Sequence, residues 1–210
     1  MNDYDVERMT EVLRRDGFER TEVAEEADMI VVNTCSIREK AENKAASAAG
    51  RYQKLKERNP NLLVAIGGCV AQQEGEALLK RIPSADLTFG PDQIPSLGAH
   101  YDKLRPQADL GSWPQIAAKA NRYKLRLAQT EVIDVEDYQF LDADPRPGDV
   151  NVTALVTIQK GCDNFCAYCI VPRTRGREVS RPADQVVREV ERFVSLGARE
   201  VTLIGQNVNA

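Results

Sequence analysis

The chain has 210 residues, of which 42% are hydrophobic and 29% are charged, and its formal net charge is −4. This is the composition of a soluble protein with one or two domains, and it excludes a general electrostatic attraction to nucleic acid, so any such binding must be local. No apolar run approaches the ~20 residues of a membrane span. The polar residues after Met1 do not have the pattern of a secretory signal sequence. We therefore expect a cytoplasmic enzyme without a membrane segment.

The first 90 residues predict strands that alternate with helices. Val6, Met9 and Val12 recur at helical spacing until Gly17, which is typical of a helix end. The further predicted elements are a strand over 29–33, a helix from about 41 to 59, a strand over 62–66, a helix over about 72–81 and a short element over 86–89. Strands that alternate with helices predict a parallel α/β sheet.

Cys35 and Cys69 each follow one of these predicted strands directly. The carboxyl ends of parallel strands lie along one edge of a sheet, and this edge is where open α/β sheets bind ligands. A single cysteine there is most simply a buried free thiol, but two at equivalent strand ends indicate a shared role. Two thiolates are too few for an iron–sulfur cubane, so the ligand set of this region is incomplete.

The sequence between residues 104 and 148 gives weaker signals. A helix is possible over 116–129, and its basic residues either contact RNA or form a solvated face. These basic residues are Lys119, Arg122, Lys124 and Arg126. His100 has no partner pattern, and we expect it at the surface without a role. The stretch 142–148 is rich in proline and charge, which predicts a linker between a first domain over 1–141 and a second over 149–210.

The strongest motif is the loop that follows the apolar, β-branched run 152–158, which itself predicts a buried parallel strand. The loop carries Cys162, Cys166 and Cys169 at C-x-x-x-C-x-x-C spacing. Three thiolates in this pattern can bind three irons of a [4Fe–4S] cluster and leave the fourth iron open. A bacterial ferredoxin run has a different spacing and four thiolates, and a zinc site needs a fourth ligand nearby. So many cysteines in one metal-type loop also indicate a reducing compartment.

A cationic stretch follows this loop, and a strand–helix–strand pattern is completed after it. Four arginines in the stretch either bind an anion, such as a carboxylate or a phosphate, or form an exposed charged loop. They are Arg173, Arg175, Arg177 and Arg181. Pro182 begins a predicted helix that ends near Gly197, and 200–204 is a predicted strand. With the strand before the cysteine loop, these elements predict a right-handed βαβ unit.

These motifs resemble those of radical S-adenosylmethionine (SAM) methylthiotransferases. The cysteine loop, with the aromatic Tyr168 before its last cysteine, is similar to the cluster loop of radical SAM enzymes. The segments 33–42 and 67–72, around the other two cysteines, resemble two motifs of the methylthiotransferase branch. The resemblance covers 1–101 and 149–210. It implies an α/β fold, with an N-terminal parallel α/β domain followed by the start of a radical SAM (βα) partial barrel.

The resemblance also implies that the chain is truncated at both ends. Family members carry a third cysteine in the first domain, and the segment that begins at Met1 matches the residues directly after that cysteine. The first ligand would then lie two residues before Met1, and the domain would lack its first strand. The rest of the barrel and a small RNA-binding β-domain would follow Ala210. We expect this chain on its own to be inactive.

The cofactors that the resemblance implies are two [4Fe–4S] clusters and SAM. Cys162, Cys166 and Cys169 would hold the cluster whose open iron binds SAM. One electron from this cluster would cleave SAM to methionine and a 5′-deoxyadenosyl radical, so the cofactor supplies the difficult chemistry. Cys35 and Cys69 would be two of the ligands of the other cluster, which delivers or carries the sulfur.

The resemblance further implies contacts to SAM and a substrate. Gly205 and Gln206, after the last predicted strand, and Tyr168 would bind the cofactor. The segment 36–40 resembles the branch that transfers a methylthio group to N6-isopentenyladenosine next to the tRNA anticodon. The alternatives are another tRNA adenosine, a ribosomal-protein aspartate, or a non-catalytic iron–sulfur module for electron transfer. The expected partners are a tRNA and an electron donor such as a flavodoxin-type protein, and we expect a monomer.

Overall fold

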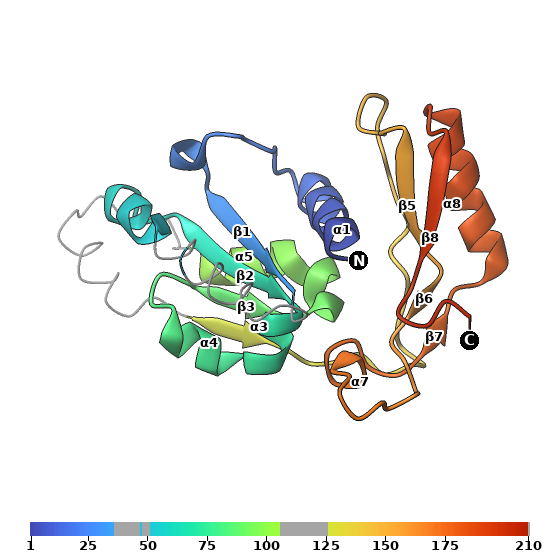
Figure 1. Ribbon diagram of the computed structural model, residues 1–210. Helices are drawn as coiled ribbons and strands as arrows, with labels where there is room; N and C mark the ends of the chain where they lie inside the picture. Colours follow the sequence, from blue (N-terminus) through green and yellow to red (C-terminus); the bar gives the residue numbers. More distant parts are fainter. Residues whose placement is uncertain (36–46, 48–50, 106–125, 210) are drawn as a thin grey trace.

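The computed structural model describes residues 1–35, 47, 51–105 and 126–209. Its strands form a four-stranded sheet in the N-terminal part, and a parallel pair and a short antiparallel pair in the C-terminal part. Helix α1 (Asn2–Arg15) lies on the side of the sheet that faces the C-terminal part (Figure 1). It contacts both parts, since Arg14 Nη1 is 2.6 Å from Asp149 Oδ2.

The N-terminal sheet has the strand order β1-β2-β3-β4, and every neighbouring pair is parallel. Its strands are β1 (Met29–Thr34), β2 (Leu63–Gly68), β3 (Leu87–Phe89) and β4 (Leu127–Gln129). The strands expected over 29–33 and 62–66 and the short element expected over 86–89 are all present. The parallel α/β class predicted from the alternation of elements is therefore confirmed.

Helical segments cover both faces of this sheet. Besides α1 they are η1 (Ala24–Glu26), α3 (Cys69–Glu74), α4 (Glu76–Arg81), η2 (Pro91–Ser96) and α5 (Leu97–Leu104), and residues 51–58 are also helical. Within the part of the chain that the structure describes, no helix has the length and apolarity that a membrane span requires.

Alternate residues of β2 face opposite sides of the sheet, and both sides are buried. Leu63 belongs to a buried cluster with Met9 and Val12 of α1 and with residues of α5. Ile66 belongs to a second cluster, with residues of α3 and α4 that include Leu78. All six residues of β2 are buried, as expected for a central strand of a parallel sheet that is covered on both faces.

The helix expected over 72–81 is two short helices in the structure. Gly75 separates α3 from α4 with a φ of +49°, a backbone conformation that favours glycine. Helix α3 also begins earlier than predicted, at Cys69. The helix expected from about 41 to 59 is present over 51–58, and the stretch before it lies largely outside the described residues.

The prediction of a helix over 116–129 is wrong at the carboxyl end of this stretch. Most of this stretch, with three of its four basic residues, lies outside the described residues, but its last three residues form strand β4. Arg126 does not contribute to a basic face. Its guanidinium donates hydrogen bonds to the carbonyl oxygens of Leu79, Ile82 and Ala85. These contacts lie at and just beyond the end of α4, where helix carbonyls have no partner within the helix.

His100 is buried, so the surface position expected for it is wrong. It lies in α5, between Leu97 and Leu104 at helical spacing, and all three share the buried face of this helix. Burial lowers the pKa of His100, which favours the neutral imidazole. Neither ring nitrogen has a hydrogen-bond partner among the described residues. The sequence pattern failed here because α5 itself was not predicted.

The C-terminal part contains the predicted βαβ unit. Its elements are β5 (Thr153–Thr157), α8 (Ala183–Ser195) and β8 (Glu200–Ile204). The two strands are parallel neighbours, and Phe193 of α8 shares a buried cluster with Ala154 and Val156 of β5. Ala143, from the stretch expected to be a linker, belongs to the same cluster. This stretch is therefore anchored to the C-terminal part.

Two short strands close the cysteine loop at its base. They are β6 (Gln159–Lys160) and β7 (Val179–Ser180), and helix α7 (Val171–Thr174) lies between them along the chain. Antiparallel pairing aligns Gln159 with Ser180 and Lys160 with Val179. We call this pairing the β6–β7 clip. It holds together the two ends of the loop 161–178, which carries the three cysteines.

Candidate functional site

Cys35 and Cys69 lie next to each other at the carboxyl edge of the N-terminal sheet. Parallel pairing aligns Thr34, the last residue of β1, with Gly68, the last residue of β2. Cys35 directly follows Thr34, and Cys69 directly follows Gly68. Both cysteines are half-buried. The structure therefore places the two cysteines at equivalent strand ends, as the sequence predicted. The segment 36–42, which comes after the first of them, lies outside the described residues.

Gly68 permits the close pairing of the two strand ends. It has a φ of +97°, and a Cβ at this position would lie 2.2 Å from the carbonyl oxygen of Thr34. The Thr34 hydroxyl donates a 2.6 Å hydrogen bond to the carbonyl oxygen of Gly67. Asn33 Nδ2 donates a 3.0 Å hydrogen bond to the carbonyl oxygen of Asn2. The start of α1 therefore meets the same edge as the two cysteines.

The three cysteines of the other site share one loop but differ in exposure. Cys162 is buried, Cys169 is half-buried and Cys166 is exposed. Gly161, directly before the first of them, has a φ of +75°, and a Cβ there would lie 2.0 Å from the carbonyl oxygen of Arg177. The backbone N–H of Cys169 donates a 3.0 Å hydrogen bond to the carbonyl oxygen of Cys166. A turn thus brings the last two cysteines together.

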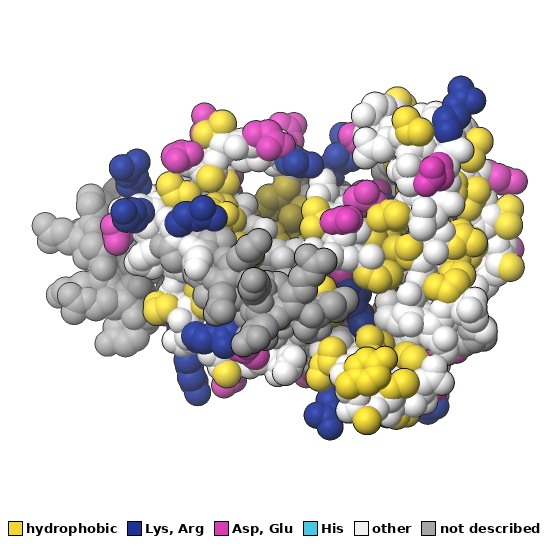
Figure 2. Space-filling view, viewed as in Figure 1, with side chains coloured by type: hydrophobic (Ala, Val, Ile, Leu, Met, Phe, Trp, Pro, Cys, Tyr) yellow, Lys and Arg dark blue, Asp and Glu magenta, His cyan; other side chains and the backbone are white. Residues whose placement is uncertain are grey.

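The aromatic residues of this loop face outward. Phe165 has a φ of +47°, unusual for a residue with a side chain, and Tyr168 is 94% exposed. Figure 2 shows a group of hydrophobic side chains over the region of α7 and the cysteine loop. The Tyr168 ring is therefore accessible to a ligand, and its predicted contact with SAM stays a prediction.

The donor set of the loop fits an iron–sulfur cluster. Among the described residues, no three His, Cys, Asp or Glu side chains converge as the ligands of one metal ion would. The thiolates of a four-iron cluster bind different irons, so they need not converge on one point. Cys162, Cys166 and Cys169 would hold such a cluster, because soft thiolates are the ligands that suit iron–sulfur chemistry. Gly161 and the β6–β7 clip set the backbone that presents them.

Two glutamines tie the base of the loop to the end of β8. Gln159 Oε1 accepts hydrogen bonds from the backbone N–H groups of Gln206 at 2.8 Å and Asn207 at 3.0 Å. Gln206 Oε1 in turn accepts one from the N–H of Gly161. Gln206 Nε2 is buried and has no partner among the described residues. A Cβ on Gly205 would lie 2.8 Å from Gln159 Oε1, so a glycine fits there.

Two of the four arginines after the loop are buried in ion pairs. Arg181 Nη1 is 2.5 Å from Glu189 Oε2 of α8, and Arg175 pairs with Asp5 of α1. Both guanidiniums are thus neutralised within the chain. For these two residues the interpretation as an exposed charged loop is wrong, because both side chains are buried.

The other two arginines are exposed, as one alternative predicted. Arg177 Nη2 is 3.0 Å from Asp163 Oδ2, across the base of the cysteine loop. The hydrogen bond from this guanidinium holds the pKa of the Asp163 carboxyl below its usual value. Arg173 forms no ion pair within the described parts of the chain. An exposed, uncommitted cation therefore remains on α7.

A further buried ion pair joins the two parts of the molecule. Lys160 Nζ, in β6, is 2.6 Å from Asp92 Oδ2 in η2, and it lies 3.9 Å from the centre of the Tyr138 ring. Burial lowers the pKa of Lys160, an effect that Asp92 opposes, and burial raises the pKa of Tyr138. The sequence analysis missed this pair. The one signal in the sequence was the position of Lys160 soon after an apolar predicted strand. A lysine that is buried at such a position needs a partner of opposite charge.

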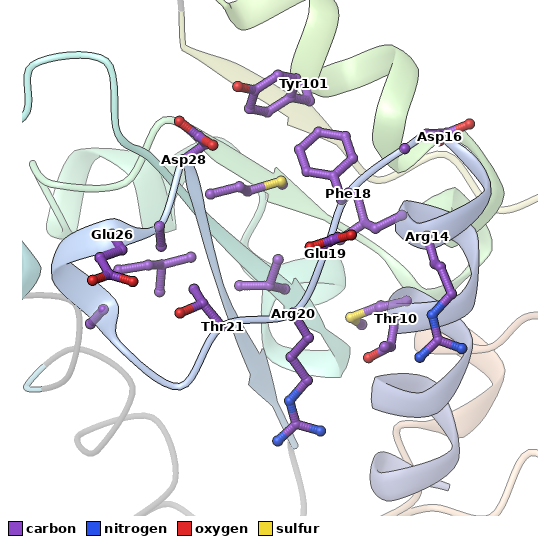
Figure 3. A pocket seen from close by; sticks show the side chains of 18 of the residues that line it. Thr10, Arg14, Asp16, Phe18, Glu19, Arg20, Thr21, Glu26, Asp28 and Tyr101 are labelled. Atoms are coloured by element: carbon purple, nitrogen blue, oxygen red, sulfur yellow. The ribbon is translucent and has the colours of Figure 1, made fainter. Parts of the chain in front are cut away.

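A cavity of about 1050 Å³ lies beside α1 and β1, with part of α5 among its walls. The rings of Phe18 and Tyr101 meet edge to face in it, with centroids 4.8 Å apart. Figure 3 shows these rings beside each other, with Asp28 and Arg14 on opposite sides of them. None of the described residues that line the cavity is a cysteine.

Comparisons with known protein families give separate matches for the two parts of the chain. Residues 1–90 match the model of the uncharacterized protein family UPF0004, and residues 156–210 match that of the radical SAM superfamily. The second match begins within β5 and includes the whole cysteine loop. The C-terminal part is thus similar to radical SAM proteins, and the N-terminal part is similar to a different family.

Over all of its 210 residues the chain is similar to proteins named tRNA-2-methylthio-N(6)-dimethylallyladenosine synthase. It is 48% identical to the one from Anaeromyxobacter sp. (strain K), 46% to that from Myxococcus xanthus (strain DK1622) and 42% to that from Acinetobacter baumannii (strain AYE). The matches cover 100% of this chain and 41%, 42% and 41% of these relatives. The resemblance to radical SAM methylthiotransferases that the motifs predicted is therefore confirmed, and the chain spans about two fifths of the length of the curated relatives it matches.

A solved structure with a similar fold is that of the radical S-adenosylmethionine methyltransferase TsrM from Kitasatospora setae, with cobalamin and a [4Fe–4S] cluster bound. The TM-score is 0.59 at 16% identity, and the match covers 99% of this chain and 47% of that chain. At this identity the likeness concerns the fold alone. It agrees with the expected α/β architecture, in which a parallel α/β domain precedes the start of a radical SAM barrel.

Proposed function

We propose that this chain is part of an enzyme that adds a methylthio group to N6-isopentenyladenosine next to the anticodon of a tRNA. The observation that carries the proposal is the presence of two separate thiol sites, a radical SAM cysteine loop in one part and paired strand-end cysteines in the other. Identities of 42–48% to proteins named for methylthiolation of N(6)-dimethylallyladenosine in tRNA support this substrate.

The two thiol sites support a pair of [4Fe–4S] clusters, one in each part. Cys162, Cys166 and Cys169 would hold the cluster that binds SAM, and Cys35 and Cys69 would be ligands of the other. When bound, the first cluster supplies the electron for reductive cleavage of SAM. Two thiolates alone do not complete the ligand set of an N-terminal cluster.

Residues around the loop base have roles in binding SAM. Gln206 Nε2 is a buried donor without a partner among the described residues, and a buried donor of this kind requires an acceptor. The carboxylate or another acceptor of bound SAM would satisfy it. Gly205 allows the backbone to pass close to Gln159, and the exposed Tyr168 ring can cover the cofactor from the loop.

The remaining assignments rest on the same proposal. The substrate is a tRNA, the electron donor is a protein of the flavodoxin type, and the enzyme is a monomer in the cytoplasm. The domains are 1–141, which carries the paired strand-end cysteines, and 149–210, which carries the SAM-binding loop, with 142–148 between them. The anchoring of Ala143 to the second domain supports a short and fixed connection.

The test uses the full-length protein under anaerobic conditions with a reductant, SAM and a tRNA that carries N6-isopentenyladenosine. We expect Cys166→Ala to lose 5′-deoxyadenosine and the methylthio nucleoside together, because its thiolate belongs to the SAM-binding site. Cys35→Ala should lose only the methylthio nucleoside. Chromatography of 5′-deoxyadenosine and mass spectrometry of digested tRNA measure both products. Undiminished 5′-deoxyadenosine in Cys166→Ala, or its loss in Cys35→Ala, would contradict this division of roles.

The same preparation distinguishes the other reactions. A ribosomal-protein substrate and a tRNA with unmodified adenosine should give no methylthio product. Addition of SAM to the reduced protein should change the EPR spectrum, because an open iron can bind it. An unchanged spectrum would indicate a cluster with four protein ligands, as in an electron-transfer module.

A further inference from the structure

One arginine of the C-terminal part reaches the carboxyl edge of the N-terminal sheet. The guanidinium of Arg175 donates two hydrogen bonds to the Asp5 carboxylate of α1, from Nη1 to Oδ1 at 3.1 Å and from Nη2 to Oδ2 at 2.5 Å. Only 8% of Arg175 and 3% of Asp5 is exposed. A buried guanidinium needs such a partner, because an unpaired charge in the interior is strongly destabilising.

The Cys69 side chain lies close enough to this guanidinium to affect its pKa: burial lowers the pKa of Arg175, and Asp5 and then Cys69 raise it, so that the pKa lies above its usual value. Cys69 is the first residue of α3, and α3 packs against α7, the helix that ends directly before Arg175. Three segments therefore meet at one side chain. They are the first turn of α1, the strand end that carries Cys69 and the loop that carries the radical SAM cysteines.

The backbone next to Arg175 also holds the first cysteine of the radical SAM loop. The carbonyl oxygen of Gly176 accepts a hydrogen bond from the N–H of Cys162 at 3.3 Å. Gly176 has a φ of +76°, which allows the chain to turn between these two contacts. Arg175 and Gly176 are consecutive, so the side chain beside Cys69 and the backbone that holds Cys162 belong to neighbouring residues, and this short segment connects the two thiol sites.

Two simpler roles do not account for these contacts. An arginine that binds a substrate or cofactor anion needs free donors at an accessible position, whereas Arg175 is buried and Asp5 balances its charge. An ion pair that only stabilises the fold needs no contact with a cysteine. Arg173, which is exposed on α7 two residues before Arg175, shows that this stretch can carry an arginine without such contacts.

We propose that Arg175 is a positioning residue that fixes the Cys69 site against the radical SAM loop and hydrogen-bonds the Cys69 sulfur when it ligates iron. The inference rests on the proposed function, which assigns Cys69 to a cluster. Groups that hydrogen-bond to metal ligands orient them, and hydrogen bonds and charge at the sulfur atoms set the reduction potential of an iron–sulfur cluster. A cationic donor stabilises the reduced, more negative cluster. Loss of Arg175 therefore lowers the potential of the N-terminal cluster.

The test compares Arg175→Met with Arg173→Met in the full-length protein reconstituted with iron and sulfide. Methionine removes the charge and the donors but keeps an unbranched side chain, and Arg173 controls for the loss of a positive charge near α7. We expect Arg175→Met to lower the ratio of methylthio nucleoside to 5′-deoxyadenosine about 10–100-fold, the usual effect of losing an outer partner of a metal ligand. The same ratio should be unchanged in Arg173→Met.

Two further readouts do not depend on turnover. A potentiometric titration followed by EPR should shift the midpoint of one cluster to a more negative potential in Arg175→Met and of neither cluster in Arg173→Met. Hydrogen exchange should become faster at the amides of α3 and of the first turn of α1. Arg175→Lys keeps the positive charge but cannot form the bidentate contact with Asp5. The midpoint potential of this variant should therefore lie close to that of the unsubstituted protein, whereas its product ratio should stay reduced.

Unchanged potentials with an unchanged product ratio in Arg175→Met would overturn the proposal. Equal loss of both clusters would overturn it as well, because that result indicates a general folding role. If Arg175→Met does not fold, Asp5→Asn weakens the clamp while Arg175 stays in place, and it should shift the same cluster less. Absence of that shift would also overturn the proposal. The proposed function fails separately, since the outcome of Cys166→Ala does not involve the N-terminal cluster.

Discussion

Strands β2 and β8 have similar apolar sequences but very different surroundings. The first contains Leu-Val-Ala-Ile and the second Val-Thr-Leu-Ile, and both runs are typical of parallel strands. Every residue of β2 is buried, whereas no residue of β8 is buried and Leu203 is 47% exposed. An apolar run therefore predicts that a strand exists, but the elements on either side of the strand determine its burial.

The neighbours of each strand explain the difference. β2 pairs with β1 and β3, and helices pack on both of its faces. Among the described residues β8 pairs only with β5, and α8 packs against one face of this pair (Figure 1). Figure 2 shows hydrophobic side chains at the surface of this part of the molecule. Apolar area that stays in contact with water adds nothing to stability.

The largest expected effect comes from the same substitution in the two strands. Leu63→Ala in β2 should lower the free energy of unfolding by about 2–5 kcal/mol, because it leaves a cavity in a closed core. Leu203→Ala in β8 should cost less than about 1 kcal/mol, because the side chain is half exposed. Urea denaturation followed by circular dichroism measures both. Similar costs would show that β8 is as well packed as β2.

A smaller effect is expected at two glycines with positive φ, one in each part. Gly197 has a φ of +109°, and a Cβ there would have no atom of the described residues within 4 Å, so Gly197→Ala should cost only the left-handed backbone penalty of about 1–2 kcal/mol. Gly68→Ala should cost more, since its Cβ would lie 2.2 Å from the Thr34 carbonyl oxygen. Thermal unfolding of both variants gives the comparison. Equal losses would show that the β1 and β2 ends can separate freely.

Two arginines provide the third comparison. Arg126→Met removes hydrogen bonds to three carbonyl oxygens near the end of α4, and a loss of about 1–3 kcal/mol is expected from charged donors of this kind. Arg188 of α8 forms an exposed pair with Asp184 at 2.7 Å, and such pairs contribute about 0.3–0.5 kcal/mol. Arg188→Met is therefore the control. If Arg126→Met lowers the free energy of unfolding no more than Arg188→Met does, water can replace the Arg126 guanidinium at these carbonyl oxygens.

The smallest effect is expected at alkaline pH. Burial raises the pKa of Tyr138 above the value of about 10 that applies in the unfolded chain. The unfolded state then loses its proton first, so the contribution of Tyr138 to stability is complete below pH ~10 and falls above it, by at most about 1.4 kcal/mol per pH unit. Tyr138→Phe should flatten this decline in pH-dependent urea titrations. The exposed Tyr168→Phe should leave it as in the unsubstituted protein.

Local patterns were enough to predict the elements that carry the cysteines. The apolar runs before Cys35, Cys69 and Cys162 each identified a strand, and the parallel arrangement placed the first two at one sheet edge. Strand β4 was missed because its three residues are too short to show a period, and because it is held by pairing with β3. Helix α5 was missed for a related reason, since His100 occupies its apolar face.

Contacts between distant segments could not be predicted in this way. Asp5 and Arg175 are 170 positions apart, and Asp92 and Lys160 are 68 apart, so no periodicity relates them. Each residue alone is an ordinary charged side chain in a polar stretch. Only the packing of the two parts shows that these charges are buried and matched, and the connection of Cys69 to the radical SAM loop depends on them.

The β6–β7 clip affects how iron can leave and re-enter the cysteine loop. Its pairing consists of backbone contacts, which use none of the three thiolates. The ends of the loop 161–178 are therefore already joined by the fold, and the entropy of closing a loop of this length is lost before iron arrives. Oxidative loss of a cluster would free three thiols without opening the β5–β8 unit. The site can then be repaired in place, with a new cluster inserted into a polypeptide that has stayed folded.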